Sequence, residues 1–135
     1  MNIKKTANSL INFVIRRTAE IFGLLILLSG FFLFLALISY SPEDPNFIFP
    51  DNREISNLLG FKGSFTADLF LQSIGFIAYL FSFTLIITGI NIVRIKDFFL
   101  IIENIFFSIL YTVFGTIFLT NFYSKNFALY INGNG

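Results

Sequence analysis

The feature that most constrains the fold is a run of twenty residues without a charged side chain, residues 21–40. A helix of twenty residues rises about 30 Å, the thickness of the hydrocarbon core of a bilayer. Fourteen of these residues are Leu, Ile or Phe. Each favours insertion by about 0.3–0.6 kcal/mol, so together they favour it by about 4–8 kcal/mol. The run therefore predicts a transmembrane helix.

Two further apolar runs have the length of a membrane span. Residues 69–93 carry no charge, and residues 98–123 carry one acid, Glu103, near their start. Only 13% of the chain is charged, against about 25% in soluble domains. We therefore predict an all-α integral membrane protein with three transmembrane helices, at residues 21–40, 69–93 and 98–123.

The positions of Lys and Arg predict the orientation of these spans, because cytoplasmic segments are enriched in them. The leader, residues 1–20, has four, and the turn at 94–97 has two in four residues. The loop at 41–68 has two against five acids, and the tail at 124–135 has one. This pattern places the N-terminus and the turn in the cytoplasm, with the acidic loop and the tail outside. The Asn-Gly-Asn-Gly ending is typical of a turn, so we expect the sequence to be truncated before a fourth span.

The loop that follows the first span has strong turn and capping signals. Residues 41–44, Ser-Pro-Glu-Asp, predict a type I turn, and Pro45 prevents the turn from growing into a helix. Tyr40 is placed to anchor in the headgroup layer. Asp51 followed by Glu54 matches a capping box, and predicts a short amphipathic helix over residues 52–59 in the external loop.

The start of the second span is expected just beyond that short helix. Gly60 suits the end of the short helix, and Gly63 with Ser64 is expected to break the chain. Ser64 or Thr66 would then cap the second span. Asp68 would lie in its first turn, where a carboxylate suits the helix dipole.

Small residues form stripes along the second and third spans, and such stripes allow close helix packing in lipid. They predict either packing within one subunit or oligomerisation. The residues are Gly75, Ala78, Ser82 and Gly89 in the second span, and Ser108, Thr112 and Gly115 in the third. Glu103 either pairs with Arg94 or Lys96 near the inner interface or, as intramembrane acids often do, marks an ion path.

Several kinds of chemistry are excluded by composition. The chain has no Cys and no His, which removes disulfides, thiol nucleophiles, imidazole bases and most zinc sites. No G-x-x-x-x-G-K-[ST] phosphate loop occurs, and the net charge of +1 gives no general attraction to nucleic acid. We predict no catalytic, cofactor-binding or metal-binding residues in this chain, no enzymatic activity of its own and no contact with nucleic acid.

Three motifs resemble the N-terminal membrane domain of the FtsK/SpoIIIE family of bacterial DNA translocases. An S-[YF]-x-P-x-D-P motif is matched by Ser39, Tyr40, Ser41, Pro42, Glu43, Asp44 and Pro45. An N-x-x-G-x-x-G-A-x-x-A-D motif is matched by Asn57, Gly60, Gly63, Ala67 and Asp68. An F-G-x-x-A-Y pattern at the start of the following span is matched from its glycine onward by Gly75, Ala78 and Tyr79. The sequence departs from the family at Ser64, where Ala is usual, and at Phe47, where Trp or another aromatic is common.

The resemblance implies a four-span membrane domain of the bacterial inner membrane, with both ends in the cytoplasm. In the family, a long linker and a hexameric ATP-driven DNA motor follow it. The domain would be a membrane anchor that targets the translocase to the division septum, contacts other division proteins and forms a homo-oligomer. The outer loop would contribute to the interaction surface. ATP and Mg²⁺ would belong to the motor, which this sequence does not contain.

Two other classes of protein are alternatives. A small transporter or channel subunit would need several intramembrane charges or helices broken by Pro or Gly, and the spans hold no Pro and one acid. An intramembrane enzyme without His or Cys would depend on Ser or Asp, and no such pair is evident.

Overall fold

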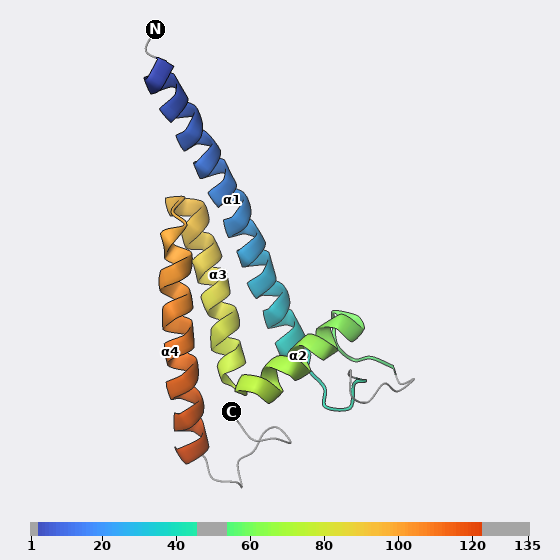
Figure 1. Ribbon diagram of the computed structural model, residues 1–135. Helices are drawn as coiled ribbons and strands as arrows, with labels where there is room; N and C mark the ends of the chain where they lie inside the picture. The colour runs from blue at the N-terminus through green and yellow to red at the C-terminus, as the bar shows by residue number, and fades with distance from the viewer. Residues whose placement is uncertain (1–2, 46–53, 123–135) are drawn as a thin grey trace.

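The computed structural model describes residues 3–45 and 54–122, which form four helices and, within these residues, no strand. They are α1 (Ile3–Ile38), α2 (Gly60–Ile74), α3 (Ile77–Ile95) and α4 (Phe99–Phe122). Three stretches are long and apolar enough to cross a membrane, Ala7–Ile38, Ile77–Ile95 and Phe99–Asn121. The three long helices lie side by side, and α2 lies across the end at which α1 stops (Figure 1). The predicted all-α class with three spans is confirmed. The predicted tail, residues 124–135, lies outside the described residues.

The leader is part of the first helix and not a separate segment. α1 has 36 residues, so it is about 54 Å long, and its N-terminal part extends beyond the turn between α3 and α4 (Figure 1). The predicted boundary at residue 20 is therefore not a helix boundary. The helix continues because no Gly or Pro precedes Gly23 and nothing else in the leader interrupts the backbone ladder.

The second predicted span is two helices instead of one. Residues 69–93 were expected to form a single helix, but α2 ends at Ile74 and α3 begins at Ile77. Gly75 lies between them with φ of 57°, a left-handed conformation that glycine adopts at little cost. The bend turns the chain from α2, across the bundle end, into α3.

The short helix predicted at residues 52–59 is wrong over the residues that the structure describes. Asp51 and residues 52–53 lie outside them, and residues 54–59 are not helical. The backbone N–H groups of Ser56 and Asn57 instead donate to the carboxylate of Asp44, both at 2.9 Å. A helix here would need those donors for its own ladder.

The helix in this loop is α2, which begins at Gly60. Gly63 and Ser64, expected to break the chain, lie inside α2, and so does Asp68. The N-cap residue is Leu59, without a side-chain cap, so Ser64 and Thr66 do not cap the second span.

The tightest helix packing joins α1 to α3. A Cβ atom on Gly89 would lie 2.5 Å from the Leu27 backbone nitrogen, and one on Gly30 would lie 2.8 Å from the Ile86 nitrogen. A Cβ on Gly23 would lie 3.0 Å from the Gly89 carbonyl oxygen. Ala78 and Ser82 on the same face of α3 are fully buried. The small residues of the second span therefore serve packing within the subunit.

The contacts of α4 are mainly with α3. A Cβ on Gly115 would meet the Cδ1 atom of Ile77 at 2.6 Å, and Ser108 is buried. The hydroxyl of Tyr111 donates to Thr84 Oγ1 at 2.9 Å. Only 6% of the α4 span is buried within the molecule. Most of the exposed surface of α4 is apolar, as at Phe106, Phe114 and Ile117.

The turn between α3 and α4 is held against α1 by an ion pair. Lys96 ends α3 in a left-handed conformation, with φ of 63°. Its Nζ lies 2.6 Å from Glu20 Oε1, and Arg17 lies 2.6 Å from the other oxygen of Glu20. Lys96, proposed above as a partner of Glu103, therefore pairs with Glu20. The Glu103 side chain is exposed on α4.

The α1–α3 contact predicts the effect of adding one methyl group. We expect Gly89→Ala to lower the free energy of unfolding by about 1–3 kcal/mol, because the new Cβ meets α1 backbone that cannot move aside cheaply. Thermal and denaturant unfolding in detergent, followed by circular dichroism, measures the change. The matched control is Gly115→Ala, where the Cβ meets the flexible end of Ile77. We expect a change within about 1 kcal/mol there. Equal losses in both variants would contradict the close α1–α3 contact.

Candidate functional site

The candidate site lies at the C-terminal end of α1 and is organised by the carboxylate of Asp44. The predicted turn is present, since the Asp44 N–H donates to the Ser41 carbonyl at 3.2 Å. The turn brings Asp44 back toward α1, where its side chain is 6% exposed. Its two oxygens accept from the backbone N–H groups of Ser56 and Asn57. The Asp44 side chain thus joins the start of the loop, residues 41–45, to residues 56–57 near its end.

Asn57 completes the end of α1. Its Nδ2 donates to the carbonyls of Ala36, at 2.9 Å, and Ser39, at 3.2 Å. Its Oδ1 accepts from the Leu59 N–H at 3.0 Å. The last carbonyls of a helix have no partner within the helix, so Asn57 supplies donors that α1 itself lacks. We call Ser39, Asp44 and Asn57 the loop knot.

Ser39 links both halves of the loop knot. Its hydroxyl donates to the Leu35 carbonyl at 2.7 Å and accepts from the Leu58 N–H at 3.2 Å. The hydroxyl therefore uses its donor and an acceptor, which a buried polar group needs in order to avoid a desolvation cost.

One face of α2 packs against the loop knot. A Cβ on Gly63 would overlap Asn57 Oδ1 and would lie 2.5 Å from Leu59 Cβ. The Ser64 hydroxyl donates to the Pro45 carbonyl at 3.3 Å, and Ala67 is fully buried. Gly60 has φ of 65°, and its N–H donates to the Asn57 carbonyl at 2.9 Å. The absence of a side chain at Gly63 therefore lets α2 approach the loop knot closely, whereas Gly60 supplies the positive φ at the start of α2.

Two tyrosines extend the network to the other helices. The Tyr40 hydroxyl donates to Asp68 Oδ1 at 3.0 Å, and Gln72 Nε2 donates to the other Asp68 oxygen at 2.8 Å. The Tyr79 hydroxyl donates to the Leu37 carbonyl at 2.9 Å. Burial raises the pKa of Tyr40 to about 12, with further contributions from its hydrogen bond to Asp68 and from the charges of Asp68 and Asp44.

The residues of the three sequence motifs meet at this end of the bundle. Ser39, Asp44, Asn57, Asp68 and Tyr79 form hydrogen bonds there. The small residues Gly60, Gly63, Ala67, Gly75 and Ala78 lie at its turns and helix contacts. Pro45 is buried and contributes its carbonyl, whereas Ser41 and Pro42 lie at the turn, with Pro42 exposed.

Other residues of the site escaped the sequence analysis. Ser56 donates its backbone N–H to Asp44, and Gln72 donates its side-chain amide to Asp68, while an α1 carbonyl accepts from Asn57. Gly23 and Gly30 oppose α3 but were not singled out. The signal for them was available, because they are the two glycines in a run of large apolar residues.

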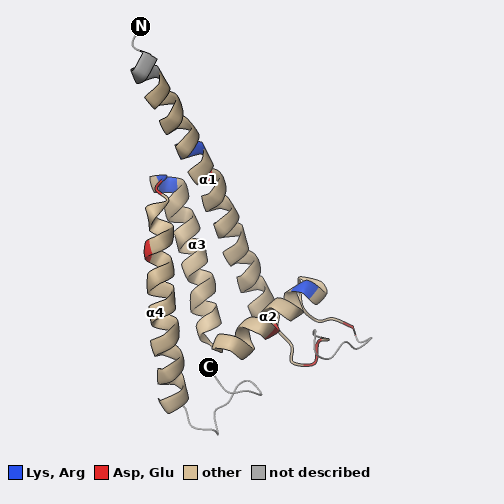
Figure 2. Cartoon of the chain, viewed as in Figure 1, with Lys and Arg blue, Asp and Glu red and all other residues tan. Residues whose placement is uncertain are grey.

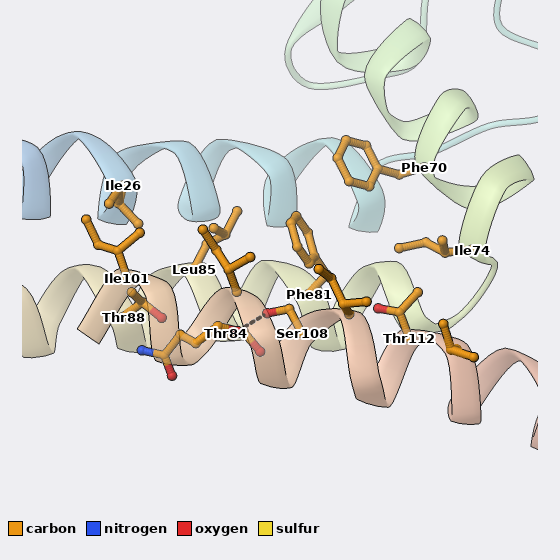
Figure 3. Close-up of a pocket in the computed structure, with 14 residues that line it drawn as sticks. Ile26, Phe70, Ile74, Phe81, Thr84, Leu85, Thr88, Ile101, Ser108 and Thr112 are labelled. Atoms are coloured by element: carbon orange, nitrogen blue, oxygen red, sulfur yellow. Dashed lines mark hydrogen bonds between the residues drawn. The ribbon is translucent and has the colours of Figure 1, made fainter. Parts of the chain in front are cut away.

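A second feature is a groove of about 560 Å³ within the bundle. Figure 3 shows Ile26 of α1 and Phe70 of α2 on one side and Ser108 and Thr112 of α4 on the other. Two of its hydroxyls bond along their own helices, since Ser108 donates to the Asn104 carbonyl at 2.6 Å and Thr84 to the Leu80 carbonyl at 2.9 Å. The wall is therefore apolar in character. Within the described residues there is no group of three or more metal-ligating side chains.

Comparison with known proteins identifies the family. Residues 15–135 match the family described as the 4TM region of the DNA translocase FtsK/SpoIIIE, so the chain belongs to this family. It is 39% identical over 70 residues to the DNA translocase FtsK of Azospirillum brasilense. That match covers 50% of this chain and 11% of the relative, so the chain matches about a tenth of the length of that protein. No solved structure matches the chain. The chain is thus a membrane domain of the FtsK/SpoIIIE type, as the motifs predicted.

The bonds of Asp44 predict a selective effect of removing its charge. In Asp44→Asn, an NH₂ group replaces one carboxylate oxygen and faces a backbone N–H donor. We expect a loss of about 1–3 kcal/mol in the free energy of unfolding and faster proteolysis of the loop. The matched control is Glu43→Gln, the same change at an exposed neighbour, with an expected effect within about 0.5 kcal/mol. The assigned role of Asp44 is wrong if the two variants behave alike.

The raised pKa of Tyr40 predicts its titration. The protonated hydroxyl contributes stability that is complete below pH 10 and is lost as the pH rises through about 12. The difference in tyrosinate absorbance between the wild type and Tyr40→Phe should therefore show a midpoint near pH 12. Asp68→Asn should move that midpoint downward. A midpoint at the ordinary value of 10.0 would contradict the buried Tyr40–Asp68 contact.

Proposed function

We propose that this membrane domain anchors a DNA translocase in the bacterial inner membrane and targets it to the division septum, without catalysis of its own. The observation that carries the proposal is the family match over residues 15–135, in a chain with three candidate spans. The translocase activity itself, with its ATP and Mg²⁺, would reside in a motor domain elsewhere in the protein. Nucleic acid would be contacted by that motor and not by this domain.

The charge distribution supports an orientation with the N-terminus in the cytoplasm. Lys and Arg on α1 and at the α3–α4 turn outnumber the acids at that end of the bundle, whereas acids outnumber the one basic residue of α2 at the loop end (Figure 2). The basic end includes Arg17 and Lys96 around Glu20. The positive-inside rule then places the loop knot outside.

The loop knot is suited to present a fixed surface to other division proteins. Its buried hydrogen bonds hold the backbone of residues 39–45 and 56–59 against α1 and α2. Glu43, Glu54 and Leu58 remain exposed around it. A preorganised surface loses less conformational entropy on binding, so rigidity here favours recognition of a membrane-protein partner.

We also propose that the domain forms a homo-oligomer, using surfaces other than the small-residue stripes. Gly89, Ser82 and Gly115 are already in contact with neighbouring helices of the same chain. The outward face of α4 is apolar and exposed, and Phe106, Phe114 and Ile117 on α4 are each more than half exposed. The groove has no charged side chain in its lining, and the hydroxyls of Thr84 and Ser108 bond to their own helices, so the groove gives no specific support to the transporter or channel alternative.

The localisation of the translocase tests the proposal. We expect a fluorescent fusion to form a band at the septum of dividing cells. Asp44→Asn should weaken that band at equal membrane abundance, because it loosens the outer loop, whereas Glu43→Gln should leave the band unchanged. An even distribution of the wild-type fusion around the cell would refute septal targeting.

Cysteine labelling tests the orientation, because the chain has no natural Cys. Glu43→Cys and Asp97→Cys place single thiols at exposed positions in the outer loop and in the α3–α4 turn. We expect a membrane-impermeant maleimide to label the first in intact spheroplasts and the second only after permeabilisation. The reverse pattern would invert the proposed topology.

A further inference from the structure

α2 has the dimensions and position of a helix at the membrane surface. It has 15 residues and is therefore about 22 Å long, shorter than the roughly 20 residues that a span requires. It lies across the end of α1 and joins α3 through the bend at Gly75 (Figure 1). A helix in this position meets the boundary between the acyl chains and the headgroups.

The two faces of α2 differ in burial. The inner face, with Gly63, Ala67 and Leu71, is buried against the bundle. The outer face carries Phe61, Phe65 and Leu69, spaced four residues apart, with 46%, 37% and 52% of their surfaces exposed. An exposed aromatic and aliphatic stripe on a helix at this depth is typical of interfacial helices.

A groove of about 320 Å³ lies beside the contact between α1 and α2. Phe32, Leu33 and Ala36 of α1 form its apolar wall, and Lys62 and Thr66 lie on the α2 side. Lys62 is exposed and is the basic residue of α2, at the loop end of the bundle (Figure 2). Its long apolar stem allows the ammonium group to reach the headgroup layer.

We propose that this groove binds a phospholipid, with its phosphate on the Lys62 ammonium and one acyl chain along Phe32, Leu33 and Ala36. The pairing of a single cation with an apolar wall requires a ligand with an anionic head and a hydrocarbon tail. The groove also opens onto the apolar surface of α1, where Phe31 and Phe32 are about half exposed. Lipid is already the neighbour of that surface in a membrane, and basic positions near helix ends attract lipid phosphate.

The bound lipid would complete the packing of α2. The Phe61, Phe65 and Leu69 stripe would lie among acyl chains, and the groove lipid would fill the space between α1 and α2. The proposed topology determines only the leaflet, which would be the outer one. The binding geometry itself does not depend on that choice.

Tryptophan fluorescence tests the proposal, because the chain has no natural Trp. Phe32→Trp places a reporter in the groove wall, and Phe65→Trp places one on the outer stripe. Each variant of the 135-residue chain is reconstituted in phosphatidylcholine vesicles that contain a small fraction of phosphatidylglycerol with brominated acyl chains, so that the anionic bromolipid competes with a host lipid of no net charge. We expect quenching of both reporters. The fluorescence of the Phe32→Trp reporter should be quenched more than the bulk fraction of bromolipid accounts for, because the groove binds this lipid. The bound bromolipid should also exchange more slowly than bulk lipid.

The charge of Lys62 is tested in the Phe32→Trp background. Lys62→Gln should weaken lipid binding about tenfold or more, because a hydrogen bond to a charged group is lost. Lys62→Arg should retain binding. The matched control is Arg94→Gln, which removes a charge from an exposed residue at the other end of the bundle. Circular dichroism of every variant checks that the helices are intact.

Three results would overturn the proposal. The first is quenching at Phe32→Trp that matches the bulk lipid fraction, and the second is a Lys62→Gln variant that binds like the wild type. The third is a Phe65→Trp reporter that is shielded from bromolipid in proportion to protein concentration, which would assign the stripe to a second copy of the chain. Vesicles with the same lipid in both leaflets make these results independent of topology, so failure here and failure of the proposed orientation are separate outcomes.

Discussion

The structure depends on how the carbonyl groups at the end of α1 are satisfied. A helix that stops near a membrane surface leaves its last carbonyls without partners in the helix, and in a medium of low polarity each one is costly. Asn57 donates to Ala36 and Ser39, and Tyr79 donates to Leu37. These donors come from the loop and from α3, so closing the end of one helix also fixes the positions of the next two.

The two ends of the bundle are held by different physical means. At the loop end, neutral and charge-assisted hydrogen bonds to backbone groups dominate, with Asp44 at their centre. At the other end, Glu20 lies between Arg17 and Lys96. Between them, the α1–α3 contact has neither charges nor hydrogen bonds between side chains, and depends on glycines that let the backbones approach. The hydrogen bonds at the loop end and the ion pairs at the other end fix the position of α1 along α3. In this position the glycines lie opposite the backbone of the facing helix.

The sequence predicts three spans, because apolar length is a direct consequence of bilayer thickness, but not their bounds, which within the described residues are Ala7–Ile38, Ile77–Ile95 and Phe99–Asn121. It does not predict the bend at Gly75, since hydropathy is the same for one long helix and for two shorter ones that meet. The capping signal at Asp51 and Glu54 was misleading for a similar reason: the local pattern was favourable, but Asp44 took the N–H groups of Ser56 and Asn57. The motifs include the side chains that form the site, whereas many of their partners are backbone N–H and carbonyl groups, which no residue pattern encodes.

The continuity of α1 has a mechanical consequence. The helix runs unbroken from Ile3 to Ile38, and its last turn is clamped by the loop knot. When one end of a rigid helix is fixed, a small change in its tilt produces a large displacement of the other end. A tilt of about 10° moves the far end of a 54 Å helix by about 9 Å. A displacement of the loop knot would therefore tilt α1 as a whole, together with the α3 backbone packed against it.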